Sequence, residues 1–232
     1  MDGYVAIITG GAGDLGRGIS KALKKAGATV VVLDIDTSRA ESADRVIRCD
    51  VADRAAAAAA VADVMATYGR IDILVNMAQS WGKFALIDVT DEEMTRVWET
   101  GPAATLRMMQ LCYPHMKAAG GGTIVNAGSS AGTQGGVPGE GVYAGAKEAI
   151  RGITKHAAAE WGPDGIRVNA ICPVATDNPG RFPAGVADRI PLRRVGDPET
   201  DVGGTVVFLA SPAGSFMTGR TLMIDGGVGM FR

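Results

Sequence analysis

The sequence has little net charge and no long apolar run, and each of these shortages excludes a class of protein. Its 232 residues include 23 basic and 25 acidic side chains, for a formal net charge of −2. The chain therefore lacks the basic field that would attract nucleic acid or an anionic membrane. It has no stretch of about 18 apolar residues, and no basic segment leads into an apolar one near its start. We expect a cytoplasmic protein with small-molecule partners, without nucleic acid and without a membrane.

Cysteine and histidine are also scarce. The chain has three widely separated cysteines, Cys49, Cys112 and Cys172, and two histidines, His115 and His156, without ligand-like spacing. Such a set indicates neither a disulfide framework nor a zinc site. We therefore expect no metal.

Apolar residues, by contrast, are abundant, at 47 % of the chain with a mean hydropathy of +0.13. A chain of this length and composition can bury a full core, so we expect residues 1–232 to form a single domain. Short β-branched runs alternate with segments of helical periodicity, which predicts a doubly wound α/β fold with a parallel sheet covered on both faces. The predicted strands are 5–9, 29–33, 45–49, 71–75, 123–127, 167–171 and 221–224.

A glycine-rich stretch, TGGAGDLGRG at 9–18, joins the first predicted strand to the first predicted helix. Glycines at this place let the backbone approach a pyrophosphate, and the helix N-terminus offers free N–H groups. The second strand ends in Asp34, where a carboxylate can accept hydrogen bonds from the adenosine ribose. No Lys or Arg follows immediately, so NAD is favoured over NADP. A tight turn at the glycines and a strand-end role for Asp34 are the alternatives.

Tyr143 and Lys147 lie four residues apart in a segment of helical pattern, so the phenol and the ammonium project from one face. A neighbouring ammonium favours the phenolate and can lower a phenol pKa from its usual value near 10. Asn126 to Ser130, which follow a predicted strand, can bring a hydroxyl beside the phenol. This pattern indicates a proton-transfer site, with a surface helix pair as the alternative.

Over essentially its whole length the sequence resembles the short-chain dehydrogenase/reductase family. The resemblance implies a single Rossmann-like domain with a seven-stranded parallel sheet, carrying both the cofactor and the substrate sites. It also implies hydride transfer between a nicotinamide and a secondary alcohol or ketone, by a homo-oligomer that is a tetramer or a dimer. The matching residues are Thr9, Gly10, Gly16, Asp34, Asp50, Val51, Asn76, Ala78, Pro114, His115, Met116, Asn126, Ser129, Tyr143, Lys147, Arg167, Val168, Asn169, Pro173, Thr218, Gly219, Asp225, Gly226 and Gly227.

The resemblance also implies a role for each site residue. Tyr143 is the acid/base, Lys147 lowers its pKa and holds the nicotinamide ribose, and Ser129 hydrogen-bonds the substrate oxygen. Counting from Asn126 points to Ser129, whereas counting 13 residues back from Tyr143 points to Ser130. We favour Ser129, because the extra residue then falls in a glycine-rich loop that tolerates insertion. The implied cofactor contacts are Gly10, Asp14, Leu15, Gly16, Asp34, Asp50, Val51, Asn76, Ala78, Tyr143, Lys147 and Pro173.

The sequence departs from the family pattern at several positions, among them Met77 and Val174, and three departures bear most on the site. Asp14 stands at its middle glycine, where it either caps the first helix or weakens pyrophosphate binding. Gln79 replaces a glycine and puts bulk where the backbone passes the adenosine. Gly101 replaces the asparagine that completes a proton relay to the lysine, and Pro102 after it should kink or break that helix.

These departures keep a second function open. A water could replace the missing amide at Gly101, or the relay could be impaired. The leading interpretation is an NAD-dependent oxidoreductase that acts on an alcohol or ketone. The alternative is a non-catalytic dinucleotide-binding protein, either a sensor or a partner subunit.

Overall fold

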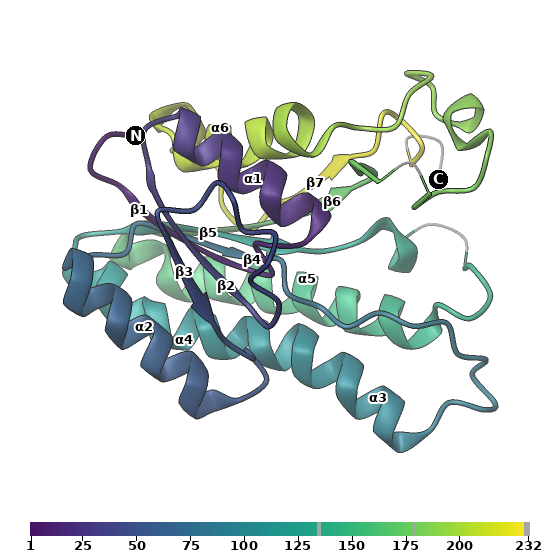
Figure 1. The fold of residues 1–232 in the computed structure, drawn as a ribbon, viewed down its shortest axis with the longest axis horizontal. Coiled ribbons are helices and arrows are strands. Elements are labelled where there is room, and N and C mark those ends of the chain that lie inside the picture. The colour runs from purple at the N-terminus through teal and green to yellow at the C-terminus, as the bar shows by residue number, and fades with distance from the viewer. Residues whose placement is uncertain (134–135, 179, 230–232) are drawn as a thin grey trace.

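The computed structural model describes residues 1–133, 136–178 and 180–229. Within these residues seven parallel strands form one sheet in the order β3-β2-β1-β4-β5-β6-β7, with helices on both faces (Figure 1). The predicted α/β fold, doubly wound with a seven-stranded parallel sheet, is confirmed. The strands are β1 Val5–Thr9, β2 Thr29–Asp34, β3 Arg45–Arg48, β4 Ile73–Asn76, β5 Gly122–Ala127, β6 Ile166–Pro173 and β7 Thr221–Ile224.

Every predicted strand is present, and the bounds differ most at β4 and β6, by up to two residues at one end. We expected β4 to begin at residue 71, whereas it begins at Ile73. The preceding residue, Asp72, directs its side chain at the neighbouring strand, where its Oδ2 accepts from the Val5 N–H at 2.8 Å. The Asp72 side chain thus bonds the first residue of β1, just before the regular pairing of β4 with β1 begins.

The helices form one layer on each side of the sheet. Figure 1 shows α1 and α6 over one face and α2, α4 and α5 over the other. Adjacent strand residues alternate between the two layers, because successive side chains of a strand point to opposite faces. Ile7 belongs to the buried cluster with Val61 and Met109, whereas Ile8 belongs to the cluster with Ile19. The helices are α1 Asp14–Lys25, α2 Arg54–Tyr68, α3 Asp91–Trp98, α4 Ala104–Ala118, α5 Gly141–Trp161 and α6 Gly204–Ala210.

We expected Gly101 and Pro102 to kink or break the helix, and the structure instead has a π-helical turn, Glu99–Ala103, between α3 and α4. Proline has no N–H to give to a carbonyl one turn back, and its ring crowds the preceding turn. In a π-helical turn each carbonyl bonds the N–H five residues later instead of four, so the turn does not need an N–H from Pro102. The chain therefore stays helical from α3 to α4.

The strand order places the candidate site. Helices leave the sheet in opposite directions on either side of the boundary between β1 and β4, and ligands of such sheets bind at the carboxyl ends of the strands beside that boundary. Among the described residues, no helix combines the length and the apolar character needed to cross a bilayer.

Candidate active site

Close backbone packing shapes the glycine-rich loop after β1. Gly10 has φ +65°, in the left-handed region, and its N–H donates to the Leu33 carbonyl at 2.8 Å. A Cβ at Gly10 would lie 2.7 Å from the Ala78 nitrogen, and one at Gly16 would overlap the Gly10 carbonyl oxygen. Glycine is therefore required at both positions, because any side chain would displace backbone that lies beside the cleft.

Asp14 is not the N-cap of α1, so that expectation is wrong. The helix begins at Asp14 itself, Gly13 stands at the N-cap, and no side chain caps it. The Asp14 carboxylate turns instead to groups that attract it more strongly. Its Oδ2 accepts from the Thr176 hydroxyl at 2.9 Å, and its Oδ1 lies 3.9 Å from an Arg17 Nη2 and 3.8 Å from an Arg39 Nη2. These partners hold the negative charge against the loop after β6.

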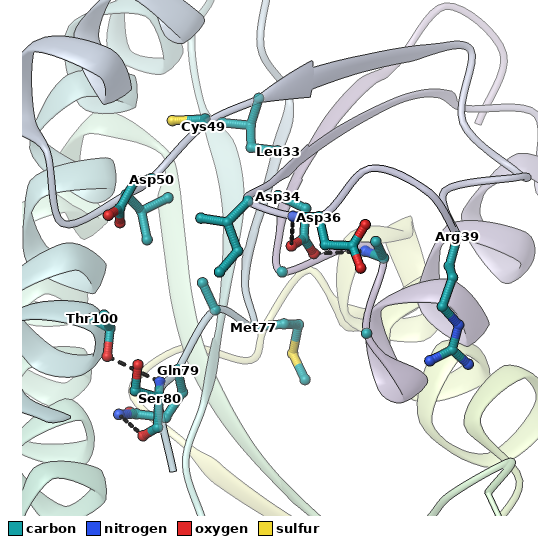
Figure 2. A pocket seen from close by; sticks show the side chains of 16 residues that line it. Leu33, Asp34, Asp36, Arg39, Cys49, Asp50, Met77, Gln79, Ser80 and Thr100 are labelled. Atoms are coloured by element: carbon teal, nitrogen blue, oxygen red, sulfur yellow. Dashed lines mark hydrogen bonds between the residues drawn. The ribbon is translucent and has the colours of Figure 1, made fainter. Parts of the chain in front are cut away.

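A cleft of about 400 Å³ lies at the carboxyl ends of β1, β2 and β4 (Figure 2). Its volume is within the roughly 300 to 1,000 Å³ of small-molecule sites. Five of the expected cofactor residues line it, namely Gly10, Asp34, Asp50, Val51 and Ala78. The glycine cradle and the carboxylate at the end of β2 fit the adenosine half of a dinucleotide.

Asp34 has both a structural and a possible binding role. Its Oδ2 accepts from the Ala12 N–H at 2.9 Å and its Oδ1 from the Asp36 N–H at 3.1 Å, so the carboxylate ties the glycine loop to the end of β2 (Figure 2). An ionised carboxylate offers about four lone pairs, which leaves acceptors for ribose hydroxyls. Asp34 therefore has the strand-end role, and this role leaves its carboxylate able to bind ribose hydroxyls as well.

Other expected cofactor residues lie outside this cleft. Asn76 is buried, and its Nδ2 donates to the Asn126 Oδ1 at 2.9 Å, which joins β4 to β5. Leu15 packs against the core under α1, and Pro173 ends β6. Their contacts with a cofactor stay predictions, as do those of Asp14 and Gly16.

Some residues that line the cleft were not among those expected from the sequence. Arg39 and Thr100 are the most informative of them. Arg39 comes five residues after Asp34, whereas the sequence reasoning considered only the residues that follow Asp34 immediately. Thr100 comes directly before Gly101 and Pro102, so the break in the helix could have signalled that this segment approaches the cleft.

The structure brings the three expected catalytic side chains together from two elements. Tyr143 and Lys147 lie on α5, and Ser129 follows β5. The Lys147 Nζ is buried, donates to the Ala127 carbonyl at 2.8 Å and lies 5.5 Å from the centroid of the Tyr143 ring. The Ser129 side chain lies near enough to the phenol to lower the pKa of Tyr143, and its hydroxyl accepts from the Ala131 N–H at 3.1 Å. This neighbourhood favours Ser129 of the two candidate serines, and its contact with a substrate oxygen stays a prediction.

The electrostatics of this group differ from what we expected. Burial raises the pKa of Tyr143 above its usual value, and the nearby Ser129 side chain and the charge of Arg181 oppose this rise without cancelling it. Burial also lowers the pKa of Lys147 to about 8. The expected lowering of the Tyr143 pKa by Lys147 is therefore not observed, because the ammonium is itself desolvated and is directed at a backbone carbonyl.

The loop after β6 lies near enough to the phenol for the charge of its Arg181 to act on the pKa of Tyr143. Its Arg181 guanidinium lies 6.0 Å from the centroid of the Trp81 ring. A second cavity, of about 350 Å³, is lined by Thr176 and Phe182 among others. This cavity thus lies along the loop after β6, of which residue 179 is outside the described part of the chain.

Known proteins resemble this chain over its full length. A family model described as Enoyl-(Acyl carrier protein) reductase matches residues 10–229. A 12alpha-hydroxysteroid dehydrogenase from Clostridium sp. is 37 % identical, with 99 % of this chain and 98 % of that protein covered. A D-threitol dehydrogenase from Mycolicibacterium smegmatis is 36 % identical, with coverages of 98 % and 93 %.

A solved structure agrees with these sequence relatives. The crystal structure of 3-ketoacyl-(acyl-carrier-protein) reductase from Brucella melitensis, complexed with NADH, has a TM-score of 0.92 to this chain at 31 % identity. The superposition covers 98 % of this chain and 99 % of that chain. The likeness therefore extends well beyond the glycine-rich loop.

Proposed function

Because this chain belongs to the short-chain dehydrogenase/reductase family, we propose that it transfers a hydride between NAD and a secondary alcohol or ketone, with Tyr143 as the acid/base. The chain is an oxidoreductase of this family that acts on CH–OH groups and uses a nicotinamide cofactor. The observation that carries the finer proposal is the phenol of Tyr143, which lies beside the Ser129 side chain and near the buried Lys147 Nζ.

Each catalytic side chain has one task at the reacting oxygen. The nicotinamide, when bound, supplies or accepts the hydride. In reduction the Tyr143 O–H donates its proton to the oxygen that gains negative charge, and in oxidation the phenolate takes the proton from the hydroxyl. Ser129 donates to the same oxygen and orients it. The raised pKa of Tyr143 keeps the phenol protonated at neutral pH, which suits the direction of reduction.

We propose NAD rather than NADP as the cofactor. The Asp34 carboxylate lines the cleft at the end of β2, where it would accept from ribose hydroxyls and repel a phosphate at that ribose. Arg39 also lines the cleft, but its guanidinium lies beside the Asp14 carboxylate, which offsets part of its charge. The proposed cofactor contacts are Gly10, Asp14, Leu15, Gly16, Asp34, Asp50, Val51, Asn76, Ala78, Tyr143, Lys147 and Pro173.

We further propose that residues 1–232 form one domain with both sites and that the protein is a homo-oligomer. Three large apolar side chains support an interface on the side of α6 and β7. Phe216 is fully exposed, and Phe208 and Met223 are 40 % and 41 % exposed. All three lie in or between α6 and β7, and large exposed apolar side chains are frequent on surfaces that associate.

The alternative function is a non-catalytic dinucleotide-binding protein, and Gly101 is the observation that favours it. One experiment separates the two functions. The purified protein is titrated with NADH and with NADPH, then assayed with hydroxysteroids, polyols and simple ketones beside Tyr143→Phe. Turnover that the variant loses supports the enzyme, whereas NADH binding without turnover across the panel would favour the alternative.

A further inference from the structure

Gln79, in the loop after β4, lies against Gly101 in the π-helical turn. A Cβ built on Gly101 would overlap the Gln79 Oε1, and it would lie 2.9 Å from both the Gln79 Cδ and its Nε2. The carboxamide therefore fills the space that a side chain at residue 101 would occupy. The glutamine and the glycine are complementary in volume, and we call them the Gln79–Gly101 pair.

The carboxamide also bonds the end of α3 directly. The Gln79 Nε2 donates to the Val97 carbonyl and to the Ser80 carbonyl, each at 2.9 Å. Val97 lies in the last turn of α3, just before the π-helical turn that contains Pro102. Gln79 thus gives this carbonyl a donor from outside the helix.

A second contact joins the same two segments. The Ser80 N–H donates to the Thr100 hydroxyl at 2.9 Å, and this hydroxyl donates to the Arg96 carbonyl at 2.8 Å. Figure 2 shows Gln79, Ser80 and Thr100 grouped at one side of the nucleotide cleft. The loop after β4 is thus fastened to the end of α3 at two neighbouring points.

From Val97 the contact continues to the catalytic helix. The Val97 side chain is fully buried and packs in one cluster with Val142 and Ala146 of α5. These two residues directly precede Tyr143 and Lys147. A shift of α3 at Val97 would therefore move the phenol and the ammonium together, because closely packed interiors transmit displacement.

One acceptor of the carboxamide has no partner. The Gln79 Oε1 is buried and receives no hydrogen bond from the described residues. Lys147 is buried as well, and among its three N–H groups only the one to Ala127 has a partner in the described part of the chain. Buried polar groups are usually satisfied, and a bridging water is a common means.

We propose that Gln79 is a positioning residue for proton transfer at Tyr143. Its carboxamide, seated over Gly101, holds α3 against α5 through Val97, so that the Tyr143 phenol and the Lys147 ammonium keep their positions. The loop after β4 thus places a carboxamide where residue 101 has no side chain. The proposal rests on the proposed function of Tyr143 as the acid/base.

The test exchanges the two members of the pair. Gln79→Leu keeps the volume and removes both polar atoms of the amide, Gln79→Gly removes the side chain, and Gln79→Gly with Gly101→Asn returns a carboxamide from the other side. Gln110→Leu, at an exposed position on α4, is the matched control. For each protein we would measure kcat, KM, the pH profile of kcat and the melting temperature.

We expect Gln79→Leu and Gln79→Gly to lower kcat about ten- to hundredfold, the range that a misplacement of about 1 Å produces, and to shift the pH profile. KM for the alcohol should change less than kcat. The double variant should recover most of kcat and the wild-type profile, and Gln110→Leu should match the wild type. Wild-type kcat and pH profile in Gln79→Leu, or a double variant no better than Gln79→Gly, would overturn the proposal.

A thermal arm tests the pair separately from the chemistry. Gly101→Ala should lower the melting temperature by about 5 °C or more when Gln79 is present, because it overpacks the site, and by much less in the Gln79→Gly background. Equal losses in both backgrounds would overturn the fit on which the inference depends. Absence of wild-type turnover together with the expected thermal coupling would instead overturn the proposed function, and with it the positioning role.

Discussion

The nucleotide side of the molecule and its catalytic side tolerate change differently. Around the cleft at β1, β2 and β4, backbone groups and glycines do most of the shaping, and two unusual side chains are accommodated by their neighbours. Asp14 is accommodated by Thr176, Arg17 and Arg39. Gln79 is accommodated by the absence of a side chain at residue 101.

On the catalytic side the side chains themselves carry the chemistry. Ser129, Tyr143 and Lys147 lie within one small group, and nothing nearby duplicates the phenol among the described residues. The difference teaches that a site built from backbone can absorb an unusual side chain where a neighbour makes room or supplies a partner, as at Asp14 and Gln79, whereas a functional group such as the phenol has no such replacement. Changes on the two sides should therefore alter different measurements.

The largest effect is expected for Tyr143→Phe. It removes only the hydroxyl, so kcat should fall by at least the roughly 10² to 10⁴-fold that a positioned acid/base contributes, while NADH affinity stays nearly unchanged. Steady-state kinetics and a fluorescence titration measure the two quantities. Tyr113→Phe removes a hydroxyl that donates to Asp164 at 2.7 Å, in another part of the fold, and serves as the control. Turnover retained by Tyr143→Phe would remove the phenol from the mechanism.

Gly16→Ala should show the opposite pattern on the nucleotide side. Its Cβ would overlap the Gly10 carbonyl oxygen, so we expect a loss of about 2 kcal/mol in unfolding free energy and weaker NADH binding. Gly152→Ala, at a position in α5 with open space around it, should instead be neutral or stabilising. Urea unfolding and NADH titration of both variants check this. Unchanged stability in Gly16→Ala would show that the loop adapts more than its packing indicates.

Lys147 allows a prediction about stability and pH. Its pKa is lowered to about 8 in the folded protein, from 10.5. Between these pH values Lys147 is protonated in the unfolded chain and mostly deprotonated in the folded chain. The free energy of unfolding should therefore increase as pH rises through this window, and this gain is lost as pH is lowered to 8. The wild type should therefore gain about 1 kcal/mol over Lys147→Met between pH 8 and pH 9.

Urea unfolding of both proteins at the two pH values measures this difference. Burial raises the pKa of Cys112 and Cys172, but both proteins contain these thiols, so their contribution cancels. Parallel pH dependence of the two proteins would mean that the ammonium is less desolvated than its burial indicates.

The sequence was sufficient for the fold and for part of the site. Strand patterns gave all seven strands, and the spacing of Tyr143 and Lys147 correctly put both on one helix. Local patterns did not show that Asp14 turns to Thr176, which lies 162 residues away in the chain, or that Gln79 fills the space at Gly101. Each of these depends on side chains that only the folded chain brings together.

The pKa expectation failed for a related reason. One helical turn between a phenol and an ammonium predicts attraction of the phenolate, but the net effect depends on how much water reaches each group. In the fold Lys147 is buried and donates to Ala127, so burial decides the pKa of both residues.

The smallest effect is expected for Asp34→Ala, and it concerns cofactor choice. Removing this carboxylate takes away both the acceptor for ribose hydroxyls and the charge that repels a phosphate, while Arg39 stays in the cleft. The ratio of NADPH to NADH dissociation constants should fall, by about tenfold for a charge contact worth about 1.4 kcal/mol. Fluorescence titrations with both cofactors measure this ratio.

The control for Asp34→Ala must separate its charge from its structural bonds. Asp34 also accepts from the Ala12 and Asp36 N–H groups, so the alanine loosens the glycine loop as well. Asp34→Asn keeps a side-chain oxygen for one of these donors and removes the charge. If the ratio falls in both variants, charge at residue 34 selects the cofactor. If the ratio falls in neither variant, Asp34 serves only to bond the glycine loop and the end of β2. The nucleotide side would then depend on backbone groups even at the position where a carboxylate lines the cleft.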